Sequence, residues 1–283
     1  MFHDLSLTIS QPGDPASWRL RRLAQRQTAR KRQARFFPPG LPLVAGLDYC
    51  GSRHTATAFS GDFFDFRSPA RDRLDVLVGD VSGSEIGAAI LKSGIQAFLR
   101  GLATRGSGPI QGDVEELSRL VYDLAPDDSR ATLFYARLDS RSGELSYVSA
   151  GHEPPLLFRG ETSRAQRLDR TGTVLGLSGH AVYSLRRVYM EPGDVLVAFT
   201  DGVTEARDTL GREWGENGIH EVFRRCRAAR SSELVVEILE SASRFVNFFV
   251  PVDDRTVVVV RLRDTMRRTL HDEESAGLAL TAA

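Results

Sequence analysis

Apolar positions in the middle of the chain form two kinds of pattern. Short runs rich in Val, Leu, Phe and Tyr, bounded by Gly, Asp or Pro, predict strands. They cover residues 43–50, 56–66, 74–81, 132–138, 145–150, 155–158, 183–190, 195–199 and 256–262. Apolar residues spaced three and four apart predict helices over 86–102, 114–124, 219–228 and 233–248.

Strands and helices follow one another in blocks and do not alternate strictly. This order favours a layered α+β domain with antiparallel sheets over a parallel βαβ fold. No Pro-, Gly- or Ser-rich linker interrupts residues 43–263. We therefore expect one domain over this range.

The two ends of the chain differ from this middle part. Residues 1–42 predict an N-terminal arm with a helix from residue 16 to about 36, which Pro38, Pro39 and Gly40 end. Between residues 19 and 35 this helix contains eight Arg or Lys residues and no acid. It reads as a solvated basic arm, and contact with nucleic acid or a membrane surface would rest on charge alone. Residues 264–283 are charged, then small, and predict a disordered tail.

Composition narrows the class of protein. The 283 residues have a formal net charge of zero, 41% hydrophobic and 26% charged residues, as in ordinary globular proteins. The N-terminal residues lack the basic and apolar regions of a signal peptide, and no apolar run reaches the roughly 20 residues that span a bilayer. The two cysteines, Cys50 and Cys226, are expected to be free thiols. These features together predict a cytoplasmic protein without a membrane-binding segment, and the zero net charge gives no general attraction to nucleic acid.

Aspartates stand at the ends of four predicted strands. They are Asp62, Asp80, Asp201 and the pair Asp253 and Asp254. A single aspartate in this setting is more often a turn former, but four such positions suggest carboxylates gathered at one end of a sheet. Close carboxylates raise one another's pKa unless a cation lies among them. Because no Cys or His cluster is nearby, Mg²⁺ or Mn²⁺ is expected in preference to Zn²⁺. The pattern predicts an oxygen-ligated hydrolytic site, with two metals as the expectation.

The motifs occur in a recognisable order. They read SGDFFDF, VGDVSG followed by GAAILKS, ATLFYARLDSRSGELSYVSAGHEPPLL, FTDGVTEARD and DDRTVVVVR. From about residue 43 to 263 the chain thereby resembles the bacterial SpoIIE-like branch of the metal-dependent serine/threonine protein phosphatases (PPM, type two-C). The resemblance implies a four-layer αββα sandwich, in which helices flank two antiparallel sheets and the metals bind at one end between them.

The resemblance also implies a role for each aspartate. Asp80 would bridge two divalent cations, Mn²⁺ or Mg²⁺, and the backbone carbonyl of Val81 would help to bind the first. Asp62 would serve the first cation, so that Asp62 and Asp80 are the catalytic acids. Asp201 and Asp253 would bind the second cation. Asp254 would share this duty or support Asp253. Such a pair of cations activates water and clamps phosphoryl oxygens, so no covalent enzyme intermediate is needed.

The function implied is hydrolysis of phosphoserine or phosphothreonine on a protein, with an anti-sigma-factor antagonist of a bacterial partner-switching pathway as the substrate. A separate sensor or activator protein and a homodimer through the N-terminal helix are the partners that it suggests. One departure matters, because Ser84 and Glu85 stand where relatives commonly have His and Gly. This departure motivates the alternative of a weakly active or inactive regulatory binding module. A DNA-associated protein using the basic arm is a third reading.

Two further side chains invite a catalytic role. His152 has a suitable pKa for a general acid, but Gly151 and the following prolines indicate a shaped turn. Asp65 in GDFFDF could contact a substrate. For both residues we favour a structural role.

Overall fold

The computed structural model describes residues 42–56, 60–83, 85–103, 108–125, 129–247 and 253–263. Two five-stranded sheets form its centre. The first contains, in spatial order, β1 (Leu47–His54), β10 (Arg255–Leu262), β9 (Val195–Phe199), β6 (Leu156–Phe158) and β7 (Ala165–Arg167). The second contains β2 (Phe63–Ala70), β3 (Arg73–Ser82), β4 (Arg130–Asp139), β5 (Glu144–Ala150) and β8 (Arg186–Tyr189). Neighbouring strands are antiparallel in both sheets.

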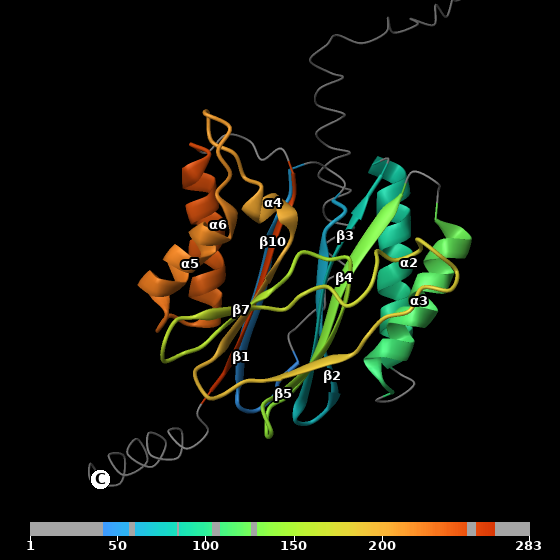
Figure 1. Cartoon of the computed structure of the whole chain (residues 1–283), viewed down its shortest axis with the longest axis horizontal. Helices are drawn as coiled ribbons and strands as arrows, with labels where there is room; N and C mark the ends of the chain where they lie inside the picture. Colours follow the sequence, from blue (N-terminus) through green and yellow to red (C-terminus); the bar gives the residue numbers. More distant parts are fainter. Residues whose placement is uncertain are drawn as a thin grey trace, which may run out of the picture.

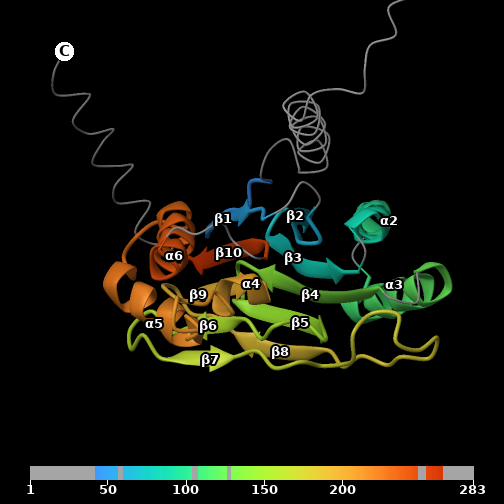
Figure 2. The ribbon, with the colours of Figure 1, turned by 90° about the horizontal axis from the view of Figure 1, so that it is seen from above.

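Helices cover the outer face of each sheet, so the domain has four layers (Figures 1 and 2). On one side lie α2 (Glu85–Ala103) and α3 (Ile110–Leu124), packed on the second sheet. On the other side α5 (Gly215–Cys226) and α6 (Ser231–Phe245) pack on the first sheet. A single helical turn, α4 (Asp201–Thr204), follows β9. The predicted αββα sandwich is confirmed.

Alternate side chains of β3 pack in two different hydrophobic clusters, one between the sheets and one beneath the helices. Val76 and Val78 face the first sheet and join the cluster between the sheets. Leu77 and Val81 point the other way and pack beneath α2 and α3. Because alternate side chains lie on opposite faces of a strand, Asp80 shares the inner face with Val76 and Val78. The polar residue therefore lies at the end of an apolar stripe between the two sheets.

Most predicted elements are present, but several bounds differ. The strands predicted over 43–50 and 56–66 are β1 at Leu47–His54 and β2 at Phe63–Ala70. These strands belong to different sheets, so the chain must leave the first sheet before residue 60 and enter the second after Asp62. The strand predicted over 183–190 shortens to Arg186–Tyr189. The elements β7 and α4 were not predicted, because three or four residues are too few to show a period.

The predicted basic helix and the tail over 264–283 lie outside the described residues. Within the residues that the structure describes, no helix combines the length and the apolar composition needed to cross a membrane.

Candidate metal centre

Strand register brings the predicted site residues to one end of the sandwich. In the second sheet Phe63 pairs with Gly79, so Asp62 before β2 lies level with Asp80 near the end of β3. In the first sheet Val257 pairs with Phe199. The residues that follow β9 and precede β10 therefore meet at the same end, and they include Asp201, Asp253 and Asp254.

Asp62 connects the two sheets through its carboxylate. The side chain is 2% exposed, and its Oδ2 accepts hydrogen bonds from Thr200 Oγ1 at 2.7 Å and Thr256 Oγ1 at 2.6 Å. Burial and the nearby charge of Asp80 raise the pKa of Asp62 well above its usual value, and the two threonine hydroxyls work in the opposite direction. The carboxyl group is therefore held in one orientation by the first sheet, although it is carried by the second.

Asp80 lies in a field of like charges. Burial raises its pKa to about 6, and the carboxylates of Asp201, Asp253 and Asp254 add to this effect, while a hydrogen bond with Asp62 opposes it. Burial likewise raises the pKa of Asp253, with contributions from Asp201 and Asp254 and against the hydrogen bond from the Asp254 amide. The five carboxylates are thus within electrostatic reach of one another. Their charges are what a bound cation would offset.

Two glycines let the backbone approach these acids. A Cβ atom at Gly61 would overlap the carbonyl oxygen of Val81 and lie 2.8 Å from Asp80 Oδ1. A Cβ atom at Gly202 would overlap the carbonyl oxygen of Asp254. The missing side chain of Gly61 leaves the Val81 carbonyl and the Asp80 carboxylate directed to the same place, as expected for two oxygen donors of one ion.

Asp253 and Asp254 differ in exposure and in contacts. Asp254 is 6% exposed, and its Oδ1 accepts a hydrogen bond from the amide of Ala56 at 2.8 Å. Asp253 is exposed, and its Oδ1 accepts a hydrogen bond from the Asp254 amide at 2.7 Å. Asp254 therefore fastens the chain after β1 to the start of β10, and the exposed Asp253 is the more accessible of the two carboxylates.

The donor set fits a hard divalent cation. It consists of carboxylate and carbonyl oxygens, among which Asp62, Asp80 and Asp253 have raised pKa values, and it contains neither thiol nor imidazole. As they stand, however, no three Asp, Glu, His or Cys side chains among the described residues converge on one point as a preformed cage. The chemistry of the donor set, and not a preformed cage, is therefore the observation that points to a hard cation.

Four functional residues were not predicted from the sequence. Lys92, in the middle of α2, is 4% exposed, donates to the carbonyl of Ser60 and lies 3.5 Å from that of Asp62. Arg53 Nη1 donates to the same Asp62 carbonyl at 2.6 Å. Burial, with the neighbouring charge of Arg53, lowers the pKa of Lys92 to about 8 against the pull of the acids. The other two are Thr200 and Thr256.

His152 and Asp65 both have structural surroundings. The imidazole of His152 is 2% exposed and its Nδ1 lies 2.8 Å from Thr132 Oγ1. Burial lowers the pKa of His152 to about 3, so the ring is neutral. Thr132 pairs with Asp80 across β3 and β4, and His152 therefore supports the site from behind. Asp65 is buried and lies 3.6 Å from the Arg100 guanidinium. These contacts favour a structural role for both residues.

The two residues that depart from the family pattern are only partly visible. Ser84 lies outside the described residues, and Glu85 is the first residue of α2. Their effect on activity stays a prediction.

Comparison with known proteins agrees with this geometry. The model of the family "Stage II sporulation protein E (SpoIIE)" matches residues 70–263. The phosphoserine phosphatase RsbU of Bacillus subtilis is 29% identical over 227 residues, which cover 78% of this chain and 65% of RsbU. The chain spans between 41% and 65% of the lengths of RsbU and two other curated relatives that it matches.

Solved structures share the fold. The RsbU and RsbW domains of Rv1364c from Mycobacterium tuberculosis are 27% identical, with a TM-score of 0.66 and coverage of 81% of this chain and 63% of that one. The SiaA-PP2C domain of Pseudomonas aeruginosa is 17% identical, with a TM-score of 0.75 and coverage of 88% and 99%. The predicted resemblance to the SpoIIE-like phosphatases is confirmed, and so is the predicted fold.

Proposed function

Because the chain belongs to the SpoIIE family, we propose that it is a divalent-cation-dependent protein phosphatase acting on phosphoserine or phosphothreonine. One observation supports this most strongly. The ends of two sheets bring five carboxylates within electrostatic reach of one another, and burial together with like charge raises the pKa of Asp62, Asp80 and Asp253. Acids with raised pKa values that gather at one place are typical of functional sites.

Two solved structures of the same fold bear on the cation. RsbX was determined in complex with magnesium, and the catalytic domain of the phosphatase PstP with 2 manganese ions. We infer that this chain likewise uses Mn²⁺ or Mg²⁺ and that two ions bind. Asp80 and the Val81 carbonyl would hold the first together with Asp62, and Asp80, Asp201 and Asp253 would hold the second.

Asp254 supports this arrangement without binding a cation itself. Its Oδ1 already accepts the Ala56 amide, and the side chain is buried beside the exposed Asp253. We therefore assign Asp253 as the direct ligand and Asp254 as the residue that fixes its backbone.

The chain's own residues orient the chemistry. When bound, the cations supply an activated water and screen the charge of the phosphoryl group. Thr200 and Thr256 hold one oxygen of Asp62, so this carboxylate cannot rotate away from Asp80. Gly61 lets its backbone lie close to both the Val81 carbonyl oxygen and Asp80 Oδ1. Preorganised oxygens of this kind need little rearrangement during turnover, which is where much catalytic stabilisation arises.

The substrate proposed is a phosphorylated anti-sigma-factor antagonist. Support comes from the curated relatives RsbU and RsbP, both named phosphoserine phosphatases. A separate activator protein and a dimer through the N-terminal helix complete the proposal, and that helix lies outside the described residues.

The test is phosphate release by the purified chain. With Mn²⁺ it should hydrolyse p-nitrophenyl phosphate and one or more members of a panel of serine-phosphorylated antagonist proteins, and a chelator should abolish both activities. Asp201→Asn should be inactive under the same conditions. If the wild-type protein released phosphate at the same rate with and without the chelator, the proposal would be contradicted.

A regulatory binding module is the second candidate, because Ser84 and Glu85 stand where relatives commonly have His and Gly. Isothermal titration calorimetry with Mn²⁺ separates the two functions. Heat of binding that is lost in Asp80→Asn supports the enzyme, whereas a chain that binds phosphoprotein but no Mn²⁺ supports the module.

A further inference from the structure

The face of α2 that packs on the second sheet carries one charged residue among apolar ones. Lys92 is 4% exposed, and its neighbours on this face, Leu91, Ile95 and Leu99, are buried in the cluster beneath the helix. A buried ammonium group costs free energy unless polar partners surround it. Its contacts should therefore show why a lysine occupies this position.

The partners of Lys92 are backbone carbonyls of the turn that carries Asp62. Its Nζ donates to the Ser60 carbonyl and lies 3.5 Å from the Asp62 carbonyl. Arg53 Nη1 donates to the Asp62 carbonyl at 2.6 Å. Residues 60–62 belong to no strand, so these carbonyls lack the ladder bonds that strands provide. Two cationic side chains thus bond the backbone carbonyls of the turn, while the Asp62 carboxylate accepts hydrogen bonds from Thr200 and Thr256.

Composition sets this lysine apart. The chain contains 37 Lys and Arg residues, of which only Lys31 and Lys92 are lysines. Arginine is a planar fork that needs width, whereas an ammonium group is a compact donor with three hydrogens. The turn 60–62 offers Lys92 two backbone carbonyls, which suit a compact ammonium group. The one described lysine therefore lies where a compact donor with three hydrogens can be used.

We propose that Lys92 is a positioning residue for the phosphatase reaction: it fastens the turn 60–62 to α2, and so keeps the Asp62 carboxylate directed at Asp80. This role rests on the proposed function. It differs from binding of the substrate phosphate, because the Lys92 ammonium is buried and already engaged with carbonyl oxygens. It also ties the site to α2, so a displacement of this helix would release the Asp62 turn.

The first experiment replaces the ammonium group and keeps the shape of the side chain. With p-nitrophenyl phosphate at saturating Mn²⁺, Lys92→Met should lower kcat by about tenfold, as expected for the loss of one charge-assisted hydrogen bond, and change KM by less than about twofold. Ser93→Ala is the matched control, because the Ser93 hydroxyl bonds only the Ala89 carbonyl of its own helix, at 2.8 Å. A wild-type kcat in Lys92→Met would overturn the proposal.

A second readout needs no metal and no activity. In hydrogen–deuterium exchange of the metal-free full chain, residues 60–63 should exchange faster in Lys92→Met, while β9 and the second half of α2 keep wild-type protection. Unchanged exchange at residues 60–63 would overturn the proposal. Ser93→Ala should match the wild type throughout.

A third measurement uses the native side chain, in case Lys92→Met fails to fold. In Lys31→Arg the only lysine is Lys92, so ¹⁵N-lysine labelling gives a single ammonium signal. Hydrogen bonding and burial should slow its exchange enough for detection in the metal-free protein, and a signal absent at pH 6 would contradict the contact. If the wild type shows no Mn²⁺-dependent hydrolysis, the proposed function fails, while the exchange and ammonium measurements still decide the contact.

Discussion

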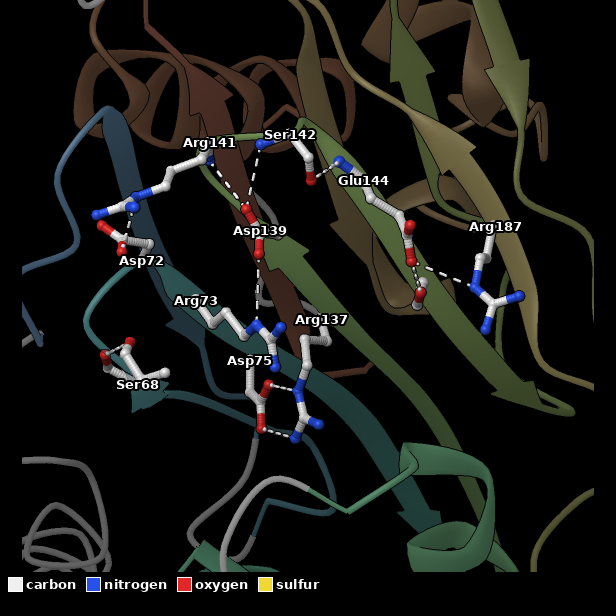
Figure 3. Close-up of polar contacts among 12 residues, drawn as sticks. Ser68, Asp72, Arg73, Asp75, Arg137, Asp139, Arg141, Ser142, Glu144 and Arg187 are labelled. Atoms are coloured by element: carbon white, nitrogen blue, oxygen red, sulfur yellow. Dashed lines mark hydrogen bonds and ion pairs between the residues drawn. The ribbon is translucent and has the colours of Figure 1, made fainter.

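Both ends of β3 carry aspartates, but the residues that face these aspartates across the sheet differ. At the first end of β3, Arg73 pairs with Asp139 and Asp75 with Arg137 across the strands, so each acid faces a guanidinium. Figure 3 shows this arginine end, where Arg141 and Arg187 hold two further acids, Asp72 and Glu144. Five positions along β3, about 17 Å away, Asp80 faces Thr132.

The two ends differ in whether a guanidinium group bonds directly to the aspartate carboxylate. We call the end with Asp62, Asp80, Asp201, Asp253 and Asp254 the metal end. At the arginine end the guanidinium groups bond the carboxylates directly, with Arg137 Nε 2.6 Å from Asp75 Oδ1. At the metal end the nearby cations, Arg53 and Lys92, bond backbone carbonyls. Asp62, Asp80 and Asp253 have raised pKa values there, which a bound cation would lower. Ion pairs at the arginine end support the strands, whereas like charges at the metal end lower stability.

The largest expected effect comes from Asp80→Asn, which removes the central acid. With p-nitrophenyl phosphate and saturating Mn²⁺, kcat should fall by at least about a hundredfold, because outer partners of metal sites alone are worth 10–100-fold. Thermal stability of the metal-free protein at pH 7 should stay the same or rise, since one uncompensated charge is lost. Activity within tenfold of the wild type would break the comparison at its metal end.

Asp75→Asn tests the arginine end with the same chemical change. It leaves the Arg137 guanidinium, whose side chain is 14% exposed, without its carboxylate, and one amide oxygen replaces the two oxygens that accept from Arg137 and Tyr135. We expect a loss of about 3 kcal/mol in the free energy of unfolding, because breaking a buried pair strands a charge. The kcat of the folded protein should not change.

Urea unfolding measures this effect, and the double variant Asp75→Asn with Arg137→Met should recover part of the loss. A single variant as stable as the wild type would show that the pair is dispensable.

The pH dependence of stability should have opposite signs at the two ends. The pKa of Asp80 is raised from 3.8 to about 6, so the folded state binds its proton more tightly than the unfolded state does. This contribution is fully present below pH 4 and is lost as pH rises through about 6, a change of about 3 kcal/mol. At the arginine end, partial burial of Asp139 is outweighed by hydrogen bonds from Ser142, Arg141 and Arg73, which lower its pKa, so its contribution is lost as pH falls.

Unfolding of the wild type and of Asp80→Asn with a chelator, between pH 4 and 7.5, isolates the metal end. The difference between the two proteins should shrink or change sign as the pH falls. Equal pH dependence in both would contradict the raised pKa of Asp80.

The strand patterns predicted much of this site and none of its supports. Alternation in LDVLVGDV places Asp80 on the inner face of β3, and the acids after β9 and before β10 follow from their strand ends. Thr200 and Thr256, however, lie 138 and 194 residues from Asp62, and only the pairing of the sheets brings them to it. No local period reveals such contacts.

Lys92 shows a different limit of prediction. Lys92 lies within the helix that the apolar spacing predicts, so the spacing alone gives no sign that this residue has a special contact. Its rarity among 37 basic residues was the available signal, but rarity alone does not say what the ammonium group contacts. The bounds of β1 and β2 failed for a related reason, because the crossing between sheets depends on which strands pair and not on hydrophobicity.

The smallest effect should come from the exposed part of the arginine end, and it sharpens what compensation means. Arg187 Nε lies 3.2 Å from Glu144 Oε1, but the two side chains are 60% and 36% exposed. Water and salt screen such a pair, so Arg187→Ala should change the free energy of unfolding by less than about 1 kcal/mol. Urea unfolding in low and high salt checks this, with Glu144→Gln as the matched variant. A loss as large as that of Asp75→Asn would mean that charge alone decides stability at this end. The small value expected would show that burial decides how much a charged pair contributes, and burial is also the first cause of the raised pKa values of Asp62 and Asp80.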